Sequence, residues 1–147
     1  MSPARPIPDR RHAYRHFDDI TTRWMDNDAY GHVNNVVYYS YFDTVVNAYL
    51  IGHGALEIAK SPVIGFVAET HCNYFSALAF PELVRAGLRV AHLGNSSVRY
   101  EIGLFRNDED LAAAQGHFVH VYVERATGKP VALPDKLVAA LKPLLMS

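Results

Sequence analysis

The chain has 147 residues, half of them apolar and a fifth of them charged, which favours one globular domain with a substantial core over residues 1–147. Its net charge of −1 gives no broad electrostatic attraction to nucleic acid or to a membrane, so neither is expected as a partner. The single cysteine, Cys72, excludes an internal disulfide and favours the cytoplasm as the compartment. Its alternating apolar context predicts a buried thiol rather than a nucleophile.

The first 34 residues predict an arm, a strand and an irregular loop. Residues 1–12 carry three prolines and no apolar segment, so we expect a loose arm. Residues 14–24 alternate between apolar and polar side chains, which favours a strand. Residues 26–34 are mostly polar and contain Gly31, which permits a turn that other residues resist.

Residues 35–51 predict a helix, and Asn34 or Asn35 is suited to cap its start. Apolar and aromatic side chains cover most of its circumference. Its polar residues share one narrow stripe and are Ser40, Asp43, Thr44 and Asn47. This pattern predicts a largely buried helix that depends on tertiary packing, ended by Gly52 and Gly54.

The remaining chain has the two-residue periodicity of strands, with short turns that imply antiparallel neighbours. The predicted strands are residues 63–75, 83–93, 96–106 and 112–125. The strand arginines Arg85, Arg89 and Arg99 are expected on solvated faces. A short amphipathic helix follows from Pro134. One strand, one long helix and four long strands predict an α+β fold in which a curved antiparallel sheet wraps around the helix.

The sequence Asp-Asn-Asp-Ala-Tyr-Gly-His-Val-Asn-Asn at residues 26–35, followed by an aromatic-rich helix, resembles the hotdog-fold acyl-CoA thioesterases of the 4-hydroxybenzoyl-CoA thioesterase-like group. The resemblance implies the hotdog fold and hydrolysis of an acyl-CoA without a bound cofactor or metal. It also implies a homodimer or homotetramer with active sites between subunits. Asn27 and Ala29 stand where the 4-hydroxybenzoyl enzyme has Cys and Pro, so an aromatic substrate does not carry over.

The resemblance assigns the catalytic carboxylate to Asp28, acting as general base or nucleophile. It assigns polarisation of the thioester carbonyl to the backbone N–H groups near Asn34 and Asn35, at the start of the helix. The neighbouring residues expected to bind substrate are Gly31, His32, Val33 and Tyr38. Because hydrolysis expels a thiolate whose conjugate acid has a pKa of about 8.5, no strong general acid is needed.

Other functions remain open on the sequence alone. A hotdog hydratase or dehydratase would use an Asp–His pair, and a non-catalytic module would bind an acyl thioester in the same pocket. Asp43, on the polar stripe of the helix, is the alternative catalytic carboxylate. Asp26 is expected to be structural. Together, Asp26, Asp28 and His32 lack the spacing of a calcium loop and the ligand count of a zinc site, so no metal is expected.

Overall fold

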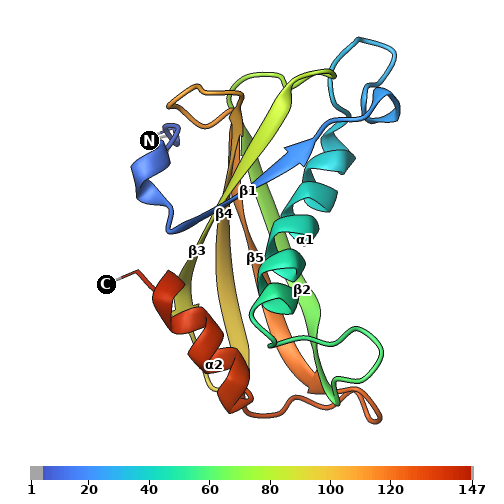
Figure 1. The fold of residues 1–147 in the computed structure, drawn as a ribbon, viewed down its shortest axis with the longest axis vertical. Coiled ribbons are helices and arrows are strands. Elements are labelled where there is room, and N and C mark those ends of the chain that lie inside the picture. The colour runs from blue at the N-terminus through green and yellow to red at the C-terminus, as the bar shows by residue number, and fades with distance from the viewer. Residues whose placement is uncertain (1–4, 147) are drawn as a thin grey trace.

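The computed structural model describes residues 5–146 and contains one five-stranded antiparallel sheet with strand order β1-β3-β4-β5-β2. The strands are β1 (His16–Thr21), β2 (Val63–Tyr74), β3 (Leu83–Leu93), β4 (Ser97–Arg106) and β5 (Ala114–Glu124). One long helix, α1, lies along one face of the sheet (Figure 1). The predicted fold class and the order of the elements are therefore confirmed.

Helix α1 (Asn35–Gly52) begins where the sequence predicts it, with the Asn34 side chain accepting a hydrogen bond from the Val36 N–H at 3.1 Å. Its inner side is buried and packs on the sheet, as where Phe42 meets Phe118 edge-to-face. Its outer side is open, and Val36 is 66% exposed. The expectation of a helix buried around most of its circumference is wrong for the single chain, because one sheet covers only one side of a helix.

Strand β2 is a twelve-residue edge strand that pairs with β5 on one side. Residues 65–71 are exposed in succession. The predicted alternation from Ile64 to Tyr74 is interrupted, since Val67 pairs with His120 and Glu69 pairs with Val119, which leaves Ala68 as an extra residue. This bulge reverses the parity of the side chains that follow.

The segment before β1, expected to be a loose arm, is bound to the sheet from Ile7 onward, where the Gln115 side chain donates to the Ile7 carbonyl at 3.0 Å; residues 1–4 lie outside the described residues. A short 3-10 helix, Arg11–Ala13, follows Asp9, whose carboxylate accepts hydrogen bonds from Tyr14 at 2.9 Å and from Arg89 at 3.3 Å. The Tyr14 ring fits because Gly103 leaves room that a Cβ would fill.

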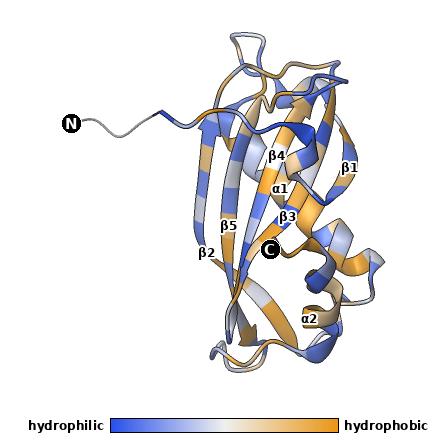
Figure 2. Cartoon of the chain, turned by 90° about the vertical axis from the view of Figure 1, so that its left-hand side faces the viewer, coloured by the Kyte–Doolittle hydropathy of each residue, from blue (hydrophilic) through white to orange (hydrophobic). Residues whose placement is uncertain are grey.

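Arg89, one of the strand arginines expected on a solvated face, lies in an ion-pair network. It also donates to Glu101 at 2.8 Å, and its side chain is 17% exposed. It is therefore held in an ion-pair network instead of being solvated as the sequence suggested. Figure 2 shows how hydrophilic and hydrophobic residues alternate along these strands.

The C-terminal segment closes one end of the sheet. Helix α2 (Asp135–Leu141) follows Pro134 as predicted, and the Tyr49 hydroxyl of α1 donates to the Ala140 carbonyl at 2.6 Å. A final 3-10 turn, Lys142–Leu144, leads to Met146, whose N–H donates to the Val90 carbonyl at 2.9 Å. Within the described residues, no helix has the length and hydrophobicity that crossing a membrane requires.

Candidate active site at the start of the central helix

Asp26 organises the loop between β1 and α1. Its side chain is 1% exposed, and its carboxylate accepts hydrogen bonds from the Tyr41 hydroxyl at 2.7 Å and the Arg23 N–H at 2.9 Å. The Arg23 guanidinium lies 3.0 Å from the other carboxylate oxygen. The Asp26 carbonyl also accepts from the Asn34 N–H at 2.9 Å, so Asp26 joins the loop to the helix start. This carboxylate is therefore structural.

Asp28 lies in a tight turn whose shape depends on Gly31. The Asp28 N–H donates to the His32 carbonyl at 2.8 Å, and the Gly31 N–H donates to the Asp28 carbonyl at 3.1 Å. Gly31 has a φ of +83°, which confirms the turn expected there and which other residues rarely adopt. One carboxylate oxygen of Asp28 accepts from the Tyr30 N–H at 2.9 Å, while the carboxylate stays partly open to solvent.

The amino end of α1 has a free hydrogen-bond donor. Asn34 caps the helix through its side chain, and its carbonyl accepts from the Val37 N–H at 2.9 Å. Within residues 5–146, the Asn35 N–H has no hydrogen-bond partner. Asn35 and Tyr38 line an open, largely apolar hollow of about 310 Å³, together with Val33 and the chain around Tyr74. A free donor at a helix start, in a residue that lines such a hollow, is suited to polarise a carbonyl oxygen.

The residues predicted from sequence fall into two separate hollows of the single chain. Asp28 and Gly31 line an open hollow of about 640 Å³ beside Trp24 and Met25. The other hollow, at the helix start, holds Val33, Asn35 and Tyr38. Asn34 is engaged in capping. The side chain of His32 is exposed and makes no hydrogen bond within the described residues.

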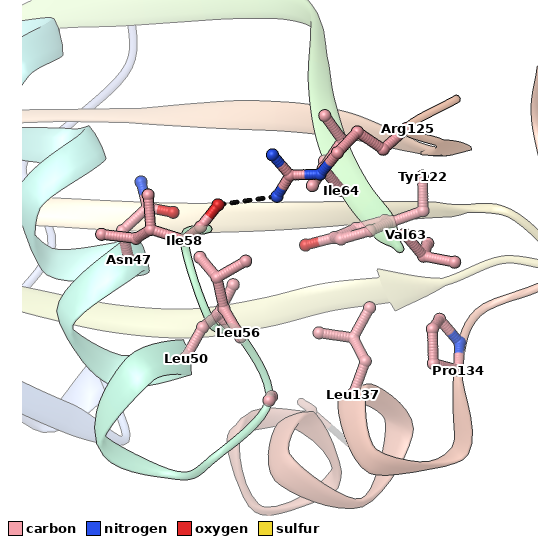
Figure 3. A pocket seen from close by; sticks show the side chains of 12 residues that line it. Asn47, Leu50, Leu56, Ile58, Val63, Ile64, Tyr122, Arg125, Pro134 and Leu137 are labelled. Atoms are coloured by element: carbon pink, nitrogen blue, oxygen red, sulfur yellow. Dashed lines mark hydrogen bonds between the residues drawn. The ribbon is translucent and has the colours of Figure 1, made fainter. Parts of the chain in front are cut away.

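A third, more enclosed cavity of about 290 Å³ lies at the opposite end of α1 (Figure 3). It is formed where α1, the start of β2 and α2 meet. The side chains that line it include Leu50, Leu56, Ile58, Val63, Tyr122 and Leu137. Sequence reasoning missed this cavity, because each of these residues alone resembles ordinary core. The one hint was the apolar pair Leu56 and Ile58 in the otherwise irregular segment after α1.

The titratable groups near the sheet and helix differ in their protonation behaviour. Burial raises the pKa of the Cys72 thiol to about 11, and Cys72 is half-buried in β2. Burial also raises the pKa of Asp43, on the open side of α1. Burial lowers the pKa of His120 to about 4, so its imidazole is neutral at physiological pH.

Within residues 5–146, no three Asp, Glu, His or Cys side chains gather as a metal site would require.

Comparison with known proteins identifies the family of the chain. A family model described as Thioesterase-like superfamily matches residues 22–141, which include the Asp28 turn, α1 and the whole β2–β5 region. The chain belongs to the Thioesterase-like superfamily. The chain is also similar to the PA5185 protein of Pseudomonas aeruginosa, with 54% identity and a TM-score of 0.93, over 95% of this chain and 98% of that one.

Two other proteins extend the comparison. A thioesterase of Thermus thermophilus, solved in complex with coenzyme A and zinc, is 30% identical, with a TM-score of 0.74 over 89% of this chain and 95% of its own. The YsmA protein of Bacillus subtilis is 26% identical over 131 residues, which are 89% of this chain and 88% of that protein. The similarity to these proteins therefore extends over nearly the whole chain.

Proposed function

We propose that the protein hydrolyses an acyl-CoA thioester to a free carboxylic acid and coenzyme A. Membership of the Thioesterase-like superfamily supports thioester hydrolysis. The coenzyme A bound to the Thermus thermophilus relative supports a coenzyme A ester as substrate. The observation that carries the proposal is the Asn35 N–H at the start of α1, which no group of residues 5–146 pairs with, seven residues after the partly exposed carboxylate of Asp28.

In the proposed reaction, the thioester carbonyl oxygen accepts a hydrogen bond from the Asn35 N–H, which stabilises the negative charge that develops on it. Asp28 removes a proton from a water molecule, whose oxygen attacks the carbonyl carbon. The C–S bond then breaks, and the coenzyme A thiolate leaves and takes up a proton from solvent. Direct attack by the Asp28 carboxylate would give an anhydride that water hydrolyses to the same products.

We infer that the working enzyme is a homodimer or homotetramer, with the site completed between subunits. The unpaired edge of β2 and the open side of α1, which includes Val36 and Ile51, support this assembly. A long edge strand with exposed apolar neighbours is a pairing surface for a second chain. Asp28 and Asn35 line separate hollows in one chain. Pairing with a second chain would enclose both residues in one site.

The carboxylate is tested by replacing Asp28 with Asn and measuring release of coenzyme A across a panel of acyl-CoA substrates. The Asn side-chain oxygen can still accept from the Tyr30 N–H, so the turn is preserved. Activity should fall by about 10²–10⁴-fold, the contribution expected of a general base. The matched control is Asp108→Asn, at a carboxylate whose side chain is 94% exposed. Full activity in a folded Asp28→Asn protein would exclude the proposed role.

The backbone donor is tested by Asn35→Pro, because proline has no N–H and fits the first position of a helix. Asn34 already has the extended backbone that a residue before proline prefers, with a ψ of 140°. We expect activity to fall by about 10²–10³-fold while the fold is kept. Asn35→Ala, which retains the N–H, should remain active. Equal activity of the two variants would contradict the role of this donor.

A further inference from the structure

The cavity at the C-terminal end of α1 has the lining of a site for an uncharged aliphatic chain. Leu50, Leu56 and Leu137 form much of its wall. The guanidinium at its rim, that of Arg125, is already engaged. It donates to the Ile58 carbonyl at 2.7 Å (Figure 3) and to the Ser61 carbonyl at 2.9 Å. These bonds hold the segment after α1 over the cavity instead of offering a charge to a ligand.

The size of the cavity sets the length of chain that it can hold. A methylene group fills about as much space as a water molecule in the liquid, ~30 Å³. The cavity of about 290 Å³ therefore accommodates a chain of about ten carbons. A coenzyme A head group, with its phosphates and adenine, would not fit.

This cavity is too distant to serve the candidate active site of its own chain. Asn35 and Leu50 lie at opposite ends of α1 (Figure 1), and fifteen residues of helix span about 22 Å. The cavity is, however, tied to the first residues of β2, since Val63 and Gly65 line it. The active-site end is tied to the last residue of β2, since the Tyr74 hydroxyl donates to the Asn35 carbonyl at 3.2 Å.

Antiparallel pairing of β2 with β2 of a second copy would join these two ends. The first residue of the strand in one copy would lie opposite the last residue in the other, so Val63 would face Tyr74 across the twofold axis. The cavity of each copy would then lie beside the start of α1 in the other copy. We propose that the cavity of one subunit holds the acyl chain of a thioester that is bound at Asp28 and Asn35 of the other, and that the substrate carries a straight aliphatic chain of about ten carbons. This inference rests on the function proposed above.

The first test measures kcat/KM against acyl-CoA substrates of increasing chain length. Each methylene buried in the cavity should raise kcat/KM about fourfold, up to about ten carbons. Leu56→Trp or Ile58→Trp should fill part of the cavity and lower hydrolysis of decanoyl-CoA at least tenfold, while hydrolysis of butyryl-CoA is kept. Leu111→Trp is the matched control, because Leu111 is 46% exposed and lies outside the cavity.

The second test asks which subunit supplies the cavity, using heterodimers purified through two different affinity tags. A dimer of one Asp28→Asn subunit and one Leu56→Trp subunit should hydrolyse decanoyl-CoA at about half the wild-type rate. Its intact carboxylate and its intact cavity lie on different chains and meet in one site. A dimer of a wild-type subunit and a subunit carrying both changes should be nearly inactive on decanoyl-CoA. The reverse result would show that each chain uses its own cavity and would overturn the proposal.

Failure of this inference can be told apart from failure of the proposed function. If the wild type hydrolyses no acyl-CoA, the proposed function is wrong. If it hydrolyses them, but Leu56→Trp and Ile58→Trp leave the chain-length profile unchanged, only the cavity assignment is wrong. Calorimetry with an S-decyl-CoA thioether gives a readout without hydrolysis. Its affinity should fall at least tenfold in Leu56→Trp and stay unchanged in Leu111→Trp, and equal affinities in the two variants would contradict the assignment.

Discussion

Replacing Tyr41 with Phe tests whether the buried Asp26 carboxylate holds the active-site loop on the central helix. The Tyr41 hydroxyl donates to Asp26 at 2.7 Å in a buried setting, and Asp26 is 1% exposed. A hydrogen bond to a charged group contributes about 1.5–3 kcal/mol to stability. We therefore expect Tyr41→Phe to lower the free energy of unfolding by that amount at pH 7, measured by urea unfolding at one fixed protein concentration.

The effect should depend on pH in a defined direction. Burial raises the pKa of the Asp26 carboxyl, but the hydrogen bonds from Arg23 and Tyr41 outweigh it and leave the pKa below the ordinary value of 3.8. The stability from this group is therefore complete above the unfolded pKa and is lost as the pH falls through the folded pKa. Losing one of these bonds raises the folded pKa, so the difference between Tyr41→Phe and wild type should shrink below about pH 4.

Tyr39→Phe is the control for this experiment. Tyr39 is a half-buried tyrosine of the same helix, and within residues 5–146 its hydroxyl has no hydrogen-bond partner. Its replacement should change stability by less than about 0.5 kcal/mol. If Tyr41→Phe behaves like Tyr39→Phe at pH 7, Asp26 does not depend on this bond and the reasoning is wrong.

Two further predictions concern β2. Gly116 of β5 leaves no room for a Cβ, which would meet the His71 carbonyl across the strand pair, so Gly116→Ala should lower the free energy of unfolding by about 1–3 kcal/mol. Gly52→Ala, where a Cβ meets nothing within 4 Å, is the control and should be neutral or stabilising. Thermal unfolding measures the stability of both variants. Because burial raises the pKa of Cys72 to about 11, iodoacetamide at pH 8 should alkylate the native protein much more slowly than the urea-unfolded chain, as followed by mass spectrometry. Equal rates in the two states would refute the burial.

The fold was predictable because local patterns and global packing agree. The long apolar stretch of α1 indicates a helix that packs on other structure, and the period-two strands after it favour a sheet that curves around this helix. The open outer side of α1 was not predictable, because it depends on how much of the helix one sheet covers. The extra residue at Ala68 was not predictable, because a bulge is set by pairing with β5. The position of the first residues was missed for a similar reason. The bonds of Asp9 to Tyr14 and Arg89 join residues up to 80 positions apart.

Of the candidate site, only the loop and the helix cap were predictable from the sequence. Gly31 indicates a turn through its own chemistry, and Asn34 is recognisable as a helix cap. The separation of Asp28 and Asn35 into different hollows follows from tertiary structure, which no spacing in the sequence encodes. The cavity near Leu56 depends on how three distant elements meet.

The extra residue at Ala68 also bears on whether β2 can add further strands at its open edge. A flat strand twelve residues long, open along one side, is a template on which extended chains add one after another into fibrils. A kink in the middle spoils that template for any straight strand, because hydrogen bonds cannot form along both halves at once. A strand with the same kink, running in the opposite direction, would match it. The bulge would thus favour pairing of the β2 edge with β2 of a second copy and would prevent further strands from adding there.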